Sequence, residues 1–209
     1  KEDDYNSHLP IGSLPLHFRK NTNDFLISSK GWLQADSRKS NDIRKKIINK
    51  KNRKIVGISW NTNSILPEKI QRNIKLDMLI QPLKKLETVF VSLQYGNTSE
   101  EISNLRSKYE IDFLEIPEID LYNDIDSLAS AISVCDCVVS IDNITPHLAG
   151  ALGVNTYLLL PLVADERWGL GTNNSYWYDS VKIYRQSTSY DWSNPLAKLK
   201  KDLKRDYLI

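Results

Sequence analysis

The sequence predicts an α/β protein in which a doubly wound parallel sheet of about six strands is covered by helices on both faces. Short, wholly apolar runs such as 137–141 and 156–160 recur along the chain, and segments with helical spacing of apolar residues separate them. Strands that are apolar throughout are typical of a parallel sheet that is buried on both sides. The 209 residues, 41% hydrophobic and 26% charged, suffice for one large domain of this kind.

The expected elements alternate from residue 54 onward, in a Rossmann-like pattern. Strands are expected at 54–60, 88–93, 112–116, 137–141, 156–160 and 181–184. Helices are expected at 37–51, 76–86, 100–109, 126–134, 145–153 and 193–207. Residues 1–36 are expected to be an irregular lead-in and residues 37–209 the Rossmann-like domain. The chain begins at Lys1 rather than Met, so we expect it to be part of a longer protein.

Cysteine content and hydropathy favour a cytoplasmic protein. Cys135 and Cys137 are too few for a disulfide framework, and we expect both to be buried as small apolar groups. No run approaches the roughly 18 apolar residues that cross a bilayer, and the N-terminus does not have the pattern of a signal peptide.

The formal net charge of +2 gives no argument for nucleic acid as a partner. Residues 38–54 nevertheless hold nine Lys or Arg against the single acid Asp42. We expect a solvated helix here, with Ile43, Ile47 and Ile48 facing inward, and contact with a membrane surface or nucleic acid is the alternative. The segment lacks aromatic residues for base stacking, which disfavours nucleic acid.

The segment 140–153 carries the strongest functional signal. It follows an apolar strand, so Asp142 is expected at the carboxyl end of that strand, directly before a helix. Thr145 is expected to cap this helix and Pro146 to take its first position, which places His147 in the first turn. Free amides and the positive end of the helix dipole attract anions, and ligands of parallel sheets bind at the carboxyl edge. The segment therefore predicts a site for a phosphorylated ligand.

Other side chains are expected at the same edge. A guanidinium matches a diphosphate bidentately, which suggests a role for Arg72, and the Trp168 ring is suited to stacking on a base. The candidate ligand-binding residues are Ser59, Asn61, Arg72, Gln94, Asp142, Asn143, Thr145, His147, Arg167 and Trp168. Structural roles remain open as alternatives: helix capping for Asp142, a surface position for Arg72 and core packing for Trp168. A dinucleotide fingerprint is missing, because the loop after the first strand, SWNTNS, has no glycine.

Several motifs occur in an order found in a known class of enzymes. They are VGISW at 56–60, RNI at 72–74, VSLQ at 91–94, IDN at 141–143, HLAGALG at 147–153, RW at 167–168, WY at 177–178 and RQ at 185–186. With these motifs the chain resembles, over roughly residues 10–207, the C-terminal half of GT-B glycosyltransferases. The nearest likeness is to bacterial proteins in which tetratricopeptide repeats precede such a domain. The ADP-heptose heptosyltransferases and protein O-GlcNAc transferases are similar more distantly.

The resemblance implies one half of a GT-B fold, in which residues 37–209 bind a nucleotide-diphosphate-sugar donor. It implies inverting transfer without a metal, and His147 would favour the departing nucleotide diphosphate. The donor is a substrate, and no separate cofactor is implied. The implied partners are the nucleotide sugar and a missing N-terminal half or repeat domain, which would supply the acceptor site and the catalytic base.

Two alternatives and one competing motif remain. A lone half of such a fold can be a non-catalytic module that binds a nucleotide or a protein, with Trp177 and Trp192 on a docking surface. A nucleotide-sugar epimerase is disfavoured, because the first loop lacks glycines. Asp124-Ile125-Asp126 has the Asp-x-Asp form of metal-dependent glycosyltransferases, but it precedes a helix, and we expect it to cap that helix, with Asp126 at the cap.

Overall fold

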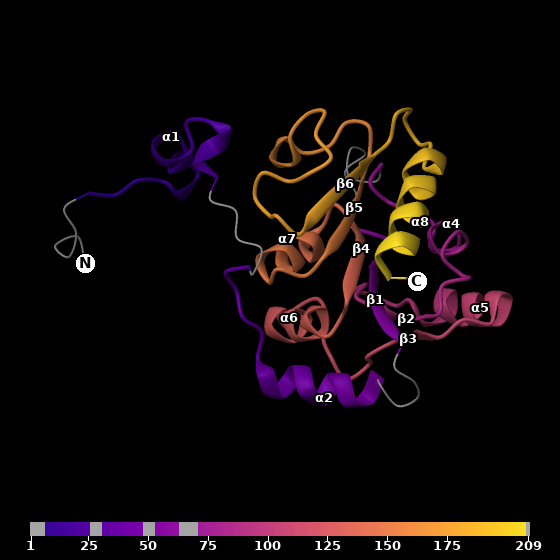
Figure 1. The fold of residues 1–209 in the computed structure, drawn as a ribbon. Coiled ribbons are helices and arrows are strands. Elements are labelled where there is room, and N and C mark those ends of the chain that lie inside the picture. Colours follow the sequence, from indigo (N-terminus) through magenta and orange to yellow (C-terminus); the bar gives the residue numbers. More distant parts are fainter. Residues whose placement is uncertain (1–6, 26–30, 48–52, 63–70, 208–209) are drawn as a thin grey trace.

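A computed structural model describes residues 7–25, 31–47, 53–62 and 71–207 (Figure 1). Its centre is a single sheet of parallel strands in the order β3-β2-β1-β4-β5-β6. The strands are β1 (Lys54–Ser59), β2 (Thr88–Ser92), β3 (Phe113–Leu114), β4 (Cys137–Ile141), β5 (Thr156–Leu160) and β6 (Val181–Arg185). The predicted fold class, an α/β doubly wound sheet, is confirmed.

Helices cover both faces of the sheet (Figure 1). One face carries α2 (Ser37–Ile47), α6 (Ile125–Ser133) and α7 (Ile144–Ala151). The other face carries α4 (Leu76–Ile80), α5 (Ser99–Tyr109) and α8 (Ser193–Tyr207). This arrangement explains why the strands are apolar at successive positions, since neighbouring residues of a strand point to opposite faces and both faces are buried.

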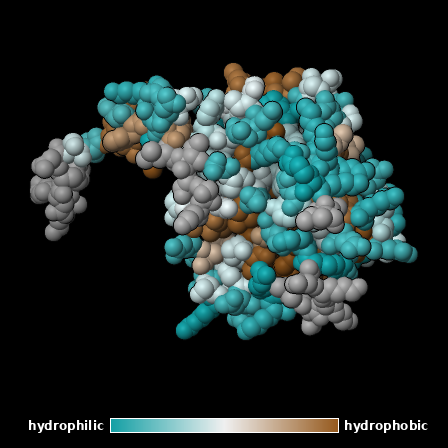
Figure 2. Space-filling model, viewed as in Figure 1, coloured by the Kyte–Doolittle hydropathy of each residue, from teal (hydrophilic) through white to brown (hydrophobic). Residues whose placement is uncertain are grey.

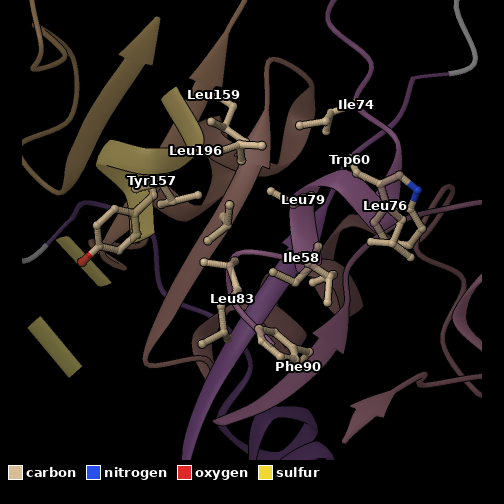
Figure 3. Packing of buried hydrophobic residues seen from close by; sticks show 14 of the residues in the cluster. Ile58, Trp60, Ile74, Leu76, Leu79, Leu83, Phe90, Tyr157, Leu159 and Leu196 are labelled. Atoms are coloured by element: carbon tan, nitrogen blue, oxygen red, sulfur yellow. The ribbon is translucent and has the colours of Figure 1, made fainter. Parts of the chain in front are cut away.

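The larger core lies between the sheet and α4, α5 and α8 (Figure 3). Ile58 and Phe90 are fully buried there and pack against Leu79 and Leu83. On the opposite face, Val138 packs in a second cluster with residues of α2 and α6, including the predicted inward-facing Ile43 and Ile47. Burial of apolar area on both faces is the main stabilising term for such a sheet.

Three of the expected elements between residues 76 and 133 differ in the structure. The helix expected at 76–86 ends at Ile80, because Pro82 has no N–H to donate to the preceding turn. The cap of α6 is Asp124, whose carboxylate accepts from the Ser127 amide over 2.9 Å, so the assignment of the cap to Asp126 is wrong. The third strand is only two residues long and forms the sheet edge.

The lead-in contains short helical turns where the sequence suggested irregular structure. They are η2 (Ile11–Ser13), α1 (Pro15–Phe18) and η3 (Thr22–Asp24), and they lie beside the body of the protein (Figure 1). Their apolar side chains are largely exposed, and Figure 2 shows them as brown atoms on this segment. The division of the chain at residue 36 remains a prediction. The expected helical residues 48–51 and most of the loop after β1 lie outside the described residues.

The cysteines are buried as expected. Cys135 and Cys137 are both free thiols in the core, and burial raises the pKa of Cys135 to about 12. They therefore pack as small apolar groups. Within the described ranges, none of the helices has the length and apolar character needed to cross a bilayer.

Candidate functional site

The chain reverses its winding direction between β1 and β4, which are neighbours in the centre of the sheet. From β1 the connections lead to β2 and β3 on one side, and from β4 they lead to β5 and β6 on the other. A crevice at the carboxyl ends of two such strands is the usual ligand position in open α/β sheets. Here β1 ends at Ser59 and β4 ends at Ile141.

Asn143 connects these two strand ends and begins α7. Its Nδ2 donates to Ser59 Oγ over 2.8 Å, and its Oδ1 accepts from the Thr145 amide over 2.9 Å. Asn143 is therefore the N-cap of α7, and the predicted assignment of the cap to Thr145 is wrong. The reason is that the extended backbone of Asn143 lets its short side chain reach the Thr145 amide. Thr145 itself is buried, and Pro146 takes the third helical position instead of the first.

This capping changes what the helix end offers to an anion. The Thr145 amide is occupied by Asn143, and Pro146 has no N–H. Two of the first three helical residues therefore present no amide to a ligand. An anion bound here would depend on cationic side chains more than on the helix amides predicted from the sequence.

Asp142 is buried and already engaged by the protein. One oxygen, Oδ1, accepts from Trp168 Nε1 over 2.8 Å, and the other, Oδ2, lies 3.0 Å from Arg72 Nη1. The side chain of Asp142 is 4% exposed, and that of Arg72 is 19% exposed. Asp142 thus holds the arginine at the carboxyl edge of β4. Of the alternatives left open, helix capping by Asp142 is wrong, and so is a surface position for Arg72.

Trp168 belongs to the core. It lies in η4 (Glu166–Trp168), is fully buried, and packs with Leu158 and Leu160 of β5. Its indole also stacks on the His147 ring, with centroids 4.5 Å apart and an interplanar angle of 23°. Stacking of Trp168 on a nucleobase, the other possibility seen in the sequence, does not fit this burial.

His147 lies in the first turns of α7 and contacts two aromatic residues. Besides Trp168, it meets Tyr178, whose hydroxyl lies 3.2 Å from His147 Nδ1. Burial lowers the pKa of His147, although the charge of Asp142 opposes this shift. The imidazole is therefore neutral near pH 7, with one nitrogen as donor and the other as acceptor.

A cavity of about 350 Å³ adjoins this histidine. It is lined by His147, Asp165, Glu166, Arg167, Trp177 and Tyr178. Arg167 is half exposed and binds Asp165 bidentately, with Nε–Oδ1 at 2.7 Å and Nη2–Oδ2 at 3.1 Å. Burial raises the pKa of Asp165, but hydrogen bonds from Arg167 and the charge of Arg72 outweigh it, and the pKa falls. The positive charges of Arg167 and Arg72 therefore both act on the Asp165 carboxylate.

Gln94 ties the end of β2 to the end of β1. Its Oε1 accepts from the amides of Trp60 and Asn61 over 2.9 and 2.8 Å and from Ser59 Oγ over 3.3 Å. Gln94 is buried, and its Nε2 donates to the Tyr95 carbonyl. The side chain predicted to read a base or ribose is thus occupied in holding two strand ends together.

A second cavity, of about 320 Å³, lies beyond Gln94. It extends from the carboxyl end of β2 to residues 115–122 and includes Tyr95 and Tyr122, whose rings are 5.3 Å apart. Both cavities lie at the carboxyl edge of the sheet. Asn61 follows β1, and its Oδ1 is buried without a hydrogen-bond partner among the described residues.

The structure brings most of the predicted residues together and adds two. Ser59, Asn61, Gln94 and Asn143 form one hydrogen-bonded group, and Arg72, Asp142, Trp168 and His147 form a contacting one. Tyr178 and Asp165 were not among the ten candidate ligand-binding residues of the sequence analysis. The sequence contained one hint of a close neighbour at this helix, Gly150, which follows His147 by one helical turn. In the structure a Cβ at Gly150 would lie 2.5 Å from Tyr178 Cγ, so only glycine leaves room for the tyrosine.

Comparisons with known proteins agree with this architecture. The fold is that of one Rossmann-like half of the two-lobed GT-B architecture. The chain is similar to ADP-heptose LPS heptosyltransferase II of E. coli, with a TM-score of 0.59 and 14% identity over 83% of this chain and 52% of that one. It is also similar to E. coli heptosyltransferase WaaC, solved with ADP-2-deoxy-2-fluoro heptose, with a TM-score of 0.50 and 14% identity over 83% and 50%.

A protein similar in sequence is Protein FlbA of Caulobacter vibrioides, 30% identical over 129 residues. The match covers 62% of this chain and 21% of FlbA, so the chain spans about a fifth of that relative and about half of each heptosyltransferase. No known family profile matches the chain. The similarity to the solved structures shows the GT-B-like fold; similarity to O-GlcNAc transferases and an association with tetratricopeptide repeats remain predictions.

Proposed function

We propose that this chain is the donor-binding half of an inverting, metal-independent GT-B glycosyltransferase. The observation that supports this most is the meeting of Arg72, His147 and Arg167 beside the start of α7, at the reversal of winding between β1 and β4. Arg72 and Arg167 are guanidinium groups, each paired with an aspartate in this structure, and His147 is a hydrogen-bonding imidazole. Guanidinium donors left over from these pairs, together with the imidazole, suit a diphosphate.

The proposed donor lies along the carboxyl edge of the sheet. Its diphosphate contacts Arg72 and Arg167, and His147 donates to a phosphate oxygen. The base or ribose occupies the cavity lined by Tyr95 and Tyr122, where the aromatic rings form part of the wall. The sugar then faces the cavity lined by Asp165 and Glu166, whose carboxylates are suited to accepting hydrogen bonds from hydroxyl groups.

The proposed reaction is a single displacement. An acceptor hydroxyl attacks the anomeric carbon, the bond from that carbon to the diphosphate oxygen breaks, and the diphosphate leaves with the electron pair. The two arginines and His147 stabilise the charge that develops on the leaving group. The base that takes the acceptor proton belongs to another part of a longer protein, which this chain does not include.

Calorimetry with ADP, UDP, GDP and CDP tests the proposal. We expect one of these to bind the wild type, and we expect Arg72→Gln to weaken its affinity by about tenfold, as for one lost charge-assisted hydrogen bond of roughly 1.4 kcal/mol. Arg44→Gln, on the exposed face of α2, serves as the matched control and leaves affinity unchanged. Failure of all four nucleotides to bind, or an equal loss in both variants, contradicts the proposal.

A turnover assay separates transfer from binding alone. If the protein is a nucleotide-binding module without catalysis, it binds the same diphosphate, but the full-length protein does not cleave the corresponding sugar nucleotide. If the full-length protein hydrolyses or transfers the sugar of the matching nucleotide sugar, and Arg72→Gln abolishes this activity, the result supports a glycosyltransferase.

A further inference from the structure

Tyr178 connects His147 to a residue of the lead-in. Its hydroxyl lies 3.2 Å from His147 Nδ1, and its ring stacks on Trp32 with centroids 5.3 Å apart and an interplanar angle of 19°. Trp32 lies 115 positions before His147 in the chain. The histidine of the candidate site is therefore in contact, through one tyrosine, with a segment that precedes the whole sheet.

The backbone explains why these residues meet. Gly150 lies one turn after His147 on α7, and the Tyr178 ring occupies the space that a Cβ at Gly150 would fill. The amides of Trp32 and Leu33 both donate to the Ala151 carbonyl, over 2.8 and 2.9 Å. The lead-in is thus hydrogen-bonded to the C-terminal end of the helix that carries His147.

The contacts of the His147 ring fix its plane and place Nδ1 within hydrogen-bond distance of the Tyr178 hydroxyl. Trp168 covers one face at a centroid distance of 4.5 Å, and Tyr178 meets Nδ1 at the ring edge. Burial raises the pKa of Tyr178, so the phenol keeps its proton at neutral pH. A protonated phenol that donates to Nδ1 makes that nitrogen the acceptor, and the imidazole proton then resides on Nε2.

We propose that Tyr178 and Trp32 are positioning residues of the anion site: Tyr178 holds His147 as the Nε2–H tautomer, and Trp32 holds Tyr178 in place. In this arrangement Nε2 is a hydrogen-bond donor suited to a phosphate oxygen, whereas the other tautomer presents a lone pair that repels it. The tautomer assignment stands on the protein alone. The identity of the anion rests on the proposed function.

Nitrogen-15 NMR of the whole chain at pH 8 measures the tautomer directly, because the two imidazole nitrogens have different shifts when protonated. His147→Gln identifies the His147 signals among the three histidines. We expect the wild type to show predominantly Nε2–H. Tyr178→Phe should give a mixture of tautomers, and Trp32→Ala should shift the ratio in the same direction by a smaller amount.

Two control variants keep this test specific. Trp32→Phe retains an aromatic ring on Tyr178 and should restore the wild-type ratio. Tyr190→Phe removes the hydroxyl of a tyrosine that is 71% exposed and should have no effect. Circular dichroism confirms that each variant is folded. A wild-type tautomer ratio in folded Tyr178→Phe overturns the proposal.

Titration with the nucleoside diphosphate that binds the wild type completes the test. We expect Tyr178→Phe to weaken its affinity by three- to tenfold, and Tyr190→Phe to leave it unchanged. If the tautomer changes but affinity does not, the positioning role at the anion site is wrong while the donor-binding function stands. If no diphosphate binds the wild type, the proposed function fails and the tautomer assignment is judged by the spectra alone.

Discussion

Asn143 Nδ2 donates a hydrogen bond to Ser59 Oγ over 2.8 Å, and this bond joins the ends of β4 and β1 where the chain reverses its winding. Ser59 Oγ in turn donates to Gln94 Oε1 over 3.3 Å at the end of β2. Three neighbouring strands are therefore linked at their carboxyl ends by a chain of polar groups, of which Ser59 and Gln94 are buried and Asn143 is partly buried. These hydrogen bonds fix the geometry of the sheet edge, because a buried polar group that loses its partner costs free energy.

Replacement of Asn143 tests this link. Asn143→Ala removes the cap of α7 and the bond to Ser59, so we expect the free energy of unfolding to fall by about 2 kcal/mol. Asn143→Asp keeps the acceptor for the Thr145 amide but loses the donor, so we expect about half that loss. Urea denaturation measures both. Asn104→Ala, on the exposed face of α5, is the control, and an Asn143→Asp variant that is as stable as the wild type would show that the bond to Ser59 contributes nothing.

Gln94 offers a second test of the same network. Gln94→Leu buries the amides of Trp60 and Asn61 without an acceptor, and each unsatisfied donor costs roughly 1–3 kcal/mol. We therefore expect a loss of about 3 kcal/mol in the free energy of unfolding. The matched control is Gln81→Leu, at an exposed turn after α4. Surface substitutions usually change the free energy of unfolding by no more than about 0.5 kcal/mol. A loss in Gln94→Leu that differs from that of the control by less than this amount would contradict the proposed role of Gln94.

Much of the fold was predictable, because apolar runs and helical spacing depend on local sequence. The runs at 137–141 and 156–160 agree with β4 and β5 residue for residue. The cap of α7 was misplaced by two residues, since Thr and Asn are both good caps and only the backbone conformation at Asn143 decides between them.

The pairing within the site was not predictable. Arg72 and Asp142 are 70 positions apart, and the sequence places both at the carboxyl edge without showing that they contact each other. The same holds for Trp168, whose indole N–H reaches Asp142 only because η4 folds back over β5. Such contacts between distant segments depend on how loops pack, and local patterns carry no information on that.

Asp142 is expected to be important for stability because it is a buried charge with two partners. Asp142→Ala leaves the Trp168 indole N–H unpaired and leaves Arg72 with only the backbone carbonyl of residue 142, at 3.3 Å, and breaking a buried ion pair on one side costs about 3–5 kcal/mol. Trp168→Phe removes only the N–H and part of the ring, so we expect a smaller loss, of about 2 kcal/mol. Thermal and urea denaturation measure both variants.

A double-mutant cycle separates the hydrogen bond from packing. The combined variant Asp142→Ala with Trp168→Phe should lose less than the sum of the single losses, because each single change already removes the shared bond. Strict additivity would mean that the Trp168–Asp142 hydrogen bond makes no net contribution.

The last prediction concerns pH. Burial lowers the pKa of His147 below the ordinary value of 6.5, so the unfolded chain binds this proton before the folded protein does as the pH falls. The free energy of unfolding should therefore decrease from pH 6.5 down to the lowered pKa of the folded state, and the contribution should become constant below it. His147→Gln removes this slope, because glutamine does not titrate.

Urea denaturation at half-unit steps from pH 8 to pH 5 checks the sign, with the difference between wild type and variant taken at each pH so that carboxylates common to both cancel. His17→Gln is the matched control, since His17 is exposed in the lead-in, and it should retain the wild-type slope. If the wild type instead gained stability relative to His147→Gln as the pH fell, His147 would be stabilised as the imidazolium. The positive charge would then outweigh burial, and His147 would bind an anion as an ion pair instead of as a neutral donor.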